Sequence, residues 1–312
     1  MPLPRLSRSK RPAGIVGLDI DTLFLAGVQA SEGRVVNAAS VELAPGLVRD
    51  GEVQEPAELG AALKAFFKES GLPNRVRIGV ANQQILMREL ELPRIEDREQ
   101  LEAAVRFQAA EAIAMPLDEA VLDFQVVGES TNLEGQPRLR VIVVAARESM
   151  VNRVVEAARG AGLKPEGIDL NAFALVRALG DPADAGDSAR VYCHIAGVSN
   201  LAVALGSTCL FTRTLVLPDE EQADHDAGEL AEQIRLSIDA YMSRPDARWV
   251  GEVVLSGPGA RRHDLAGELS ELVGVSARVA DPLPNLDLTG MPEGEDPHRH
   301  TVAAGLALGA AA

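Results

Sequence analysis

One order of secondary-structure elements occurs twice in the chain, and this repeat constrains the fold more than any other feature. Each copy has three strand-like apolar runs, then a helix, then a further strand. The first copy consists of 14–20, 24–30, 34–42, a helix between Pro56 and Gly71, and 76–81. The second consists of 189–196, 200–206, 209–217, a helix through Leu230 and Tyr241, and 252–255. A further helix near 260–272 and a strand at 275–280 follow the second copy.

The repeat predicts an α/β fold built from two ribonuclease H-like units, which is the plan of actin-like and sugar-kinase-like proteins. Between the copies, an alternating strand, a helix beginning at Asp97 and a hairpin predict a small inserted α+β subdomain. We therefore expect four segments: a disordered basic tail, a first core unit in two pieces, the insert, and a second core unit. Their boundaries are 1–13, 14–85 plus 167–188, 86–166, and 189–312.

The charge of the chain limits its partners. There are 30 basic and 46 acidic side chains, which gives a net charge of −16. Because such a surface repels phosphate backbones, we expect no nucleic-acid partner. No run approaches the roughly 20 apolar residues of a membrane span, so a cytoplasmic location is expected. The basic tail is the exception to the acidic character of the chain. It is interpreted either as a solvated, disordered segment or as a weak tether to anionic lipid or an acidic partner.

Metal-binding side chains are scattered. Cys193 and Cys209 lie in separate apolar runs, and the five histidines show no metal-ligand spacing. We therefore predict two buried free thiols and no metal site.

Six segments, in order, resemble one known family. They are GIVGLDI at 14–20, RELELP at 88–93, AEAIAMPLDE at 110–119, the run over 161–179, FTR at 211–213 and LSGPGA at 255–260. Together they resemble the type IV pilus assembly protein PilM, a relative of FtsA. The resemblance implies an actin-like fold with a small inserted subdomain and a location at the cytoplasmic face of the inner membrane. It also implies that the chain docks the cytoplasmic peptide of a PilN-like bitopic protein and works with other pilus-assembly components.

A docking groove between the first core unit and the insert follows from the same resemblance. We expect an extended peptide to bind there, by strand addition in one possible mode. The predicted lining comes from the helix after Asp97 and from the run 85–92, with Ile85, Met87, Leu90 and Leu92 as the binding residues.

The nucleotide site of this family would use two hairpin loops and a glycine-rich turn. In the first loop Asp19 and Thr22 match the family pattern, but Asp21 replaces a glycine and Ala26 stands near the place of a lysine. The second loop has His194 where a magnesium-placing carboxylate is expected.

The glycine turn keeps Gly257 and Gly259 but places Pro258 between them, and proline restricts the backbone there. Several dozen residues that wall the adenosine pocket in the family are also largely missing after Arg213. We therefore expect no catalytic residue, no enzyme activity and no cofactor, with binding of Mg-ATP disfavoured. The resemblance and these departures together favour a non-catalytic, PilM-like scaffold of a type IV pilus or related secretion assembly. The alternative is an active actin-like ATPase or a kinase of the same fold.

Overall fold

The structure is a computed structural model that describes residues 14–132, 134–181, 188–215, 217 and 226–309. The predicted basic tail, 1–13, lies outside these ranges. No helix within them is long and apolar enough to cross a membrane.

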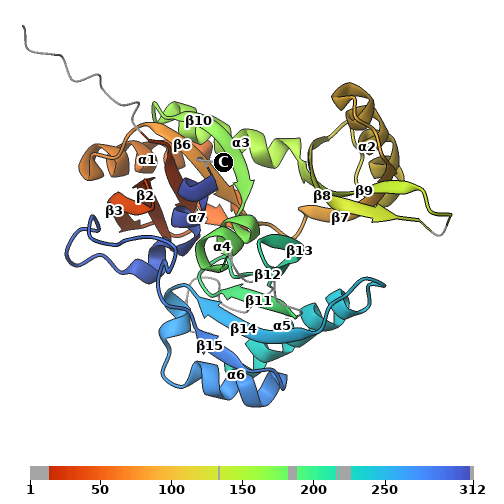
Figure 1. Ribbon diagram of the computed structural model, residues 1–312. Coiled ribbons are helices and arrows are strands. Elements are labelled where there is room, and N and C mark those ends of the chain that lie inside the picture. The colour runs from red at the N-terminus through yellow and green to blue at the C-terminus, as the bar shows by residue number, and fades with distance from the viewer. Residues whose placement is uncertain (1–13, 133, 182–187, 216, 218–225, 310–312) are drawn as a thin grey trace, which may run out of the picture.

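The first core unit contains a five-stranded sheet with the order β10-β6-β1-β2-β3 (Figure 1). Strands β1, β2 and β3 form antiparallel hairpins, whereas β6 and β10 run parallel to β1. Helix α1 starts with a proline at its first turn and ends at Gly71, whose φ of 67° suits glycine. The elements are β1 (Val16–Ile20), β2 (Phe24–Ser31), β3 (Arg34–Glu42), β4 (Val48–Arg49), β5 (Glu52–Val53), α1 (Pro56–Ser70), β6 (Arg75–Val80) and β10 (Lys164–Leu170).

The second core unit repeats this arrangement, with the strand order β13-β12-β11-β14-β15. The predicted duplication is confirmed. Among the described residues, α5 follows β13 without an intervening element, as expected for a largely missing subdomain. The elements are β11 (Ala189–His194), β12 (Asn200–Leu205), β13 (Thr208–Thr214), α5 (Ala227–Met242), β14 (Val250–Ser256), η1 (Pro258–Arg261), α6 (Leu265–Val273) and β15 (Ala277–Val279).

The inserted module projects from the two core units, at the right of Figure 1. Its three-stranded sheet has the order β7-β9-β8, so β7 and β8 are both edge strands. Helix α2 is capped by Asp97, whose side chain accepts a hydrogen bond from the Gln100 N–H at 2.9 Å. The helix covers one face of the sheet through Leu101, Val105 and Ala109. The elements are β7 (Leu86–Pro93), α2 (Arg98–Ala112), β8 (Ala120–Thr131) and β9 (Pro137–Arg147).

Three elements belong to a different part of the fold from the one that the predicted boundaries gave them. Helix α3 (Glu148–Gly160), assigned to the insert, buries Met150 and Val154 against the first core unit, and β10 already belongs to the first sheet. Helix α7 (Thr301–Gly309), which follows η2 (Pro297–His300) and was assigned to the second unit, packs on β1 and β2. An apolar face shows that a helix is buried but does not identify the surface that buries it.

Helices α4 (Asn171–Leu179) and α7 form the layer that joins the two units (Figure 1). The fit of α7 is close on both sides. A Cβ atom on Gly17 of β1 would lie 1.9 Å from the carbonyl oxygen of Ala303, and one on Gly305 would lie 1.9 Å from that of Ala174. These two glycines therefore set how closely α7 approaches the first sheet and α4.

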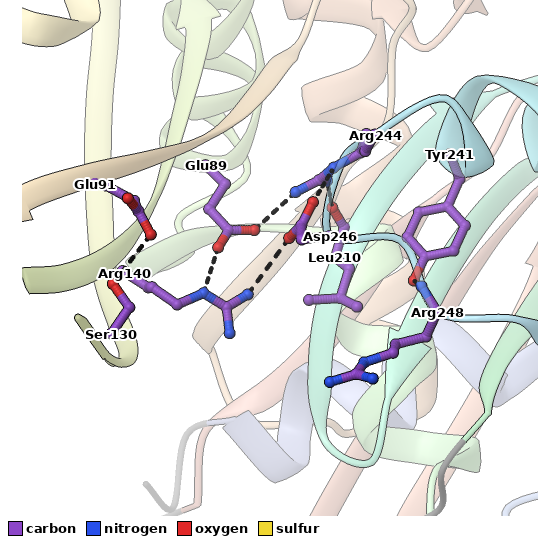
Figure 2. A network of polar contacts seen from close by, with 9 residues as sticks. All are labelled: Glu89, Glu91, Ser130, Arg140, Leu210, Tyr241, Arg244, Asp246 and Arg248. Carbon is purple, nitrogen blue, oxygen red and sulfur yellow. Dashed lines mark hydrogen bonds and ion pairs between the residues drawn. The ribbon is translucent and has the colours of Figure 1, made fainter. Parts of the chain in front are cut away.

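A network of charges ties the module to the second core unit (Figure 2). Glu89 of β7 accepts hydrogen bonds from Arg140 of β9 at 2.6 Å and from Arg244, which follows α5, at 2.7 Å. Asp246 lies within 3.7 Å of the Arg140 guanidinium and within 3.5 Å of the Arg244 guanidinium. The Arg244 guanidinium also donates to the Leu210 carbonyl oxygen. The module is thus fixed to the second unit by shared carboxylates.

Candidate functional site

The first hairpin loop, between β1 and β2, is organised by the carboxylate of Asp21. The Asp21 N–H donates to the Phe24 carbonyl oxygen at 3.0 Å, and Asp21 Oδ1 accepts from the Leu23 N–H at 2.9 Å. Asp21 is buried, and so is Thr22 beside it. This is a tight turn in which the aspartate side chain bonds its own backbone two residues on.

The same carboxylate also binds the second hairpin loop, between β11 and β12. The Val198 N–H donates to Asp21 Oδ2 at 2.7 Å, and the Gly197 N–H donates to Asp21 Oδ1 at 3.2 Å. Backbone N–H groups of paired loops are the groups that the family pattern would offer to phosphate oxygens. In this chain an aspartate oxygen atom accepts each of these hydrogen bonds.

Close packing leaves little room between the loops. A Cβ on Gly197 would lie 1.9 Å from Thr22 Oγ1 and 2.6 Å from Asp21 Oδ1, so the two loops are in direct contact. Beside them, a cavity of about 10 Å³ is lined in part by Ile20, Asn171 and Val198. That volume holds about one water molecule and not a phosphate chain.

The glycine turn packs onto the second loop. Gly257 has a φ of 87°, and a Cβ there would lie 2.4 Å from the Ile195 carbonyl oxygen and 3.0 Å from the His194 ring. The Gly259 N–H donates to the same carbonyl oxygen at 3.1 Å. Gly257 and Gly259 therefore lie against the second loop, and Asp19 and Thr22 belong to the first hairpin.

Two buried carboxyl groups lie close together in the first hairpin. Burial raises the pKa of Asp19 well above its usual value, the Asp21 charge raises it further, and a hydrogen bond from Asn171 opposes both effects. Burial also raises the pKa of Asp21, against the hydrogen bonds from Val198, Leu23 and Gly197 and the charge of Arg299. Within the described residues no cluster of three or more His, Cys, Asp or Glu side chains could hold a metal ion.

His194 is a buried side chain at the end of β11. Burial lowers its pKa to about 4, with a further contribution from nearby His298, so the ring is neutral at neutral pH. Its Nδ1 atom lies 3.2 Å from Ser256 Oγ, which joins the ends of β11 and β14. Ala26 is buried opposite Asp19 in the β1–β2 pair, so no lysine extends from that position. The predicted free thiols, Cys193 and Cys209, are both buried.

The predicted peptide-binding residues are not gathered on one surface. Leu90 and Leu92 are buried between the module sheet and α2, so this part of the prediction is corrected. Ile85 and Met87 line a smaller cavity between the module and the two core units. Helix α2 covers the face of the module sheet that points away from the groove described next, so it does not line that groove.

A larger groove of about 790 Å³ lies between the module and the core units. The module contributes the β9 residues Ile142, Val144 and Ala146, together with a consecutive stretch of β8 from Asp123 to Val127. The rest of the lining comes from α3, β10, α4 and the turn between β12 and β13, namely Val151, Ile168, Phe173, Val176 and Thr208 among others. The sequence did carry a signal for this face, because residues 141–146 are apolar on both sides of the strand.

Two ribonuclease H-like units, joined through α4 and α7 and with paired hairpin loops meeting between them, define an actin-like protein. Residues 17–215 match the family of the type IV pilus assembly protein PilM, which is more than half of the chain. The chain belongs to that family.

Solved structures agree with this assignment. A structure described as the PilM-PilN type IV pilus biogenesis complex matches with a TM-score of 0.78 and 25% identity, over 96% of this chain and 99% of the other. The ethanolamine utilization protein EutJ from Carboxydothermus hydrogenoformans matches with a TM-score of 0.53 and 14% identity, over 96% and 90% of the two chains. MreB5 of Spiroplasma citri bound to ADP matches with a TM-score of 0.52 and 10% identity, over 94% and 95%. The last two show the shared fold alone.

Proposed function

We propose that this chain is a non-catalytic scaffold of a type IV pilus or related secretion machine, which binds the cytoplasmic peptide of a PilN-like inner-membrane protein in the 790 Å³ groove. The observation that carries the proposal is the makeup of this groove, which lies between the module and the two core units. Most of its lining side chains are apolar, and the charged side chains of Arg77, Asp123, Asp169 and Arg177 also belong to it. The similar structure is described as a complex of PilM with PilN. Binding such a partner would hold the protein at the inner face of the membrane.

An extended peptide suits the groove because the groove follows a sheet edge. Strand β8 is an edge strand of the module sheet. The consecutive residues 123–127 all line the groove, whereas a strand that met the groove with one face would contribute only every second residue. The unpaired edge of β8 therefore faces the groove. The stretch 121–127 would pair with a peptide of about 23 Å, or roughly seven residues. Val121 and Val126 are 43% and 41% exposed, which leaves apolar surface for the peptide side chains.

Replacing Val126 by aspartate is expected to weaken peptide binding at least tenfold, because the peptide would bury an unpaired carboxylate against apolar groups. The measurement is a calorimetric titration with a synthetic peptide of the PilN-like partner's cytoplasmic segment. Val36→Asp is the matched control, because Val36 is a 46% exposed strand valine of β3 and does not line the groove. Equal affinity in wild type and Val126→Asp would contradict this assignment of the groove.

The non-catalytic part of the proposal rests on the Asp21 carboxylate, which already accepts the N–H groups of both loops. We expect no heat of binding when Mg-ATP is titrated into the protein up to millimolar concentration. Micromolar binding would overturn this part and favour the active ATPase. The peptide titration does not depend on this outcome, so the two parts are tested separately.

A further inference from the structure

A second cavity, of about 320 Å³, lies between the module and the two core units. Its floor includes Val80 and Leu170, the last residues of β6 and β10. Ligands of open α/β sheets bind at the carboxyl ends of the strands, and a volume of this size is typical of small-molecule sites. The proposed peptide groove shares Val80 and Leu170 with this cavity but none of the other residues that line it.

The lining of the cavity is cationic, although the chain as a whole is strongly acidic. Three arginines contribute to it, Arg88, Arg213 and Arg244. Arg244 is already paired with Glu89 and Asp246 (Figure 2), and the exposed Arg88 donates to the Met87 carbonyl oxygen at 2.9 Å. Arg213 is partly buried and pairs through its backbone with Leu201, but its side chain forms no hydrogen bond or ion pair with any other residue that the structure describes.

Among the residues that the structure describes, Arg213 is therefore the one cation of the cavity lining whose guanidinium has no partner. A guanidinium withdrawn from water without a counter-charge is unfavourable, and a bound anion would remove that cost. Its planar fork of N–H groups matches the oxygens of a phosphate or carboxylate group.

The neighbouring polar groups extend the site. Asn200 is 1% exposed and lines the cavity, and its Oδ1 atom accepts no hydrogen bond within the described part of the chain. A buried acceptor of this kind is rare and needs a donor. Asn200 pairs with Thr214 across β12 and β13, and Thr212 and Thr214 also belong to the lining. Hydroxyls can donate to an anion.

We propose that this cavity binds a small organic oxyanion, with its phosphate or carboxylate group on Arg213 and a hydroxyl or amino group donating to Asn200. Such a ligand would touch the module through β7, the first unit through β6 and β10, and the second unit through β13. Its binding therefore stabilises the arrangement of all three parts.

The first test is a titration of the full chain with inorganic phosphate in one arm and with succinate in the other, each at constant ionic strength set by sodium chloride. Calorimetry and the midpoint of thermal unfolding are both recorded. We expect saturable binding in the millimolar range in one arm, which identifies the group that Arg213 prefers. The absence of saturable binding in both arms would overturn the proposal.

Variants locate the site. Arg213→Gln is expected to weaken binding of the effective anion at least tenfold, whereas Arg213→Lys, which keeps the charge but not the fork, loses less. Arg248→Gln is the matched control, because Arg248 is an exposed arginine of the same unit outside the cavity lining. If Arg213→Gln does not fold, Arg213→Lys is compared with Arg248→Gln. If both Arg213→Gln and Arg213→Lys bind the anion with the affinity of the wild type, the anion binds elsewhere on the protein and the proposal is overturned.

The proposed hydrogen bond from a ligand hydroxyl group to Asn200 is tested by comparing two phosphate ligands. Glycerol 3-phosphate, which adds hydroxyl groups to the phosphate, is expected to bind more tightly than inorganic phosphate in the wild type. This advantage should be lost in Asn200→Ala. An equal advantage in both proteins would remove Asn200 from the site.

Discussion

Gly305→Ala is expected to destabilise the protein by about 3 kcal/mol, at the upper end of the range for overpacked interiors. The added methyl carbon would lie 1.9 Å from the Ala174 carbonyl oxygen, and this neighbour is backbone that cannot rotate away. Helices α4 and α7 would have to separate, although alanine itself favours a helix by about 1 kcal/mol over glycine. Urea unfolding followed by circular dichroism measures the difference.

The control for this substitution is Gly160→Ala at the end of α3, where an added Cβ would meet no atom within 4 Å. It is expected to be neutral or slightly stabilising. If the free energy of unfolding changes equally in the two variants, the close approach of α7 to α4 is not what makes Gly305 necessary.

Asp21→Ala is expected to destabilise the protein by about 2–4 kcal/mol. The substitution removes the acceptor of the Leu23, Gly197 and Val198 N–H groups, and a buried donor left unpaired costs roughly 1–3 kcal/mol. Part of this cost is offset because a desolvated carboxylate is removed with it. The measurement is again the free energy of unfolding at neutral pH.

A matched control for Asp21→Ala is Asp97→Ala. Asp97 also accepts a backbone N–H, that of Gln100, but at the exposed start of α2, where losing a cap costs about 1 kcal/mol. A loss at Asp21 no larger than at Asp97 would mean that the loops do not depend on this carboxylate for their contact.

The strands and helices of the core units could be predicted because their ends are marked locally. Pro56 and Gly71 bound α1, and Glu32 and Gly33 form the β2–β3 turn with φ values of 52° and 75°. The surface on which a buried helix packs is not marked locally in the sequence. The inward face of α3 is visible in the sequence, but nothing in its spacing distinguishes a module core from the α1 surface on which it packs.

The candidate site was harder to predict because its decisive contact joins distant residues. From the sequence, Asp21 could be recognised as an obstacle to a phosphate. Its role as the acceptor for Gly197 and Val198 depends on how the two core units dock, because these residues lie 176 and 177 positions after Asp21 in the chain. Leu90 and Leu92 were misplaced for a related reason, since alternation identifies the two faces of β7 but not the one that α2 covers.

The bridge between the hairpin loops has a consequence for how the protein responds to the metabolic state of a cell. The anion that holds the loops together is part of the chain, so its local concentration is fixed and no diffusible molecule has to supply it. On the proposal that the chain binds no nucleotide, contact between the two core units at this point would be the same in a growing cell and in a starved one, whatever the ratio of ATP to ADP.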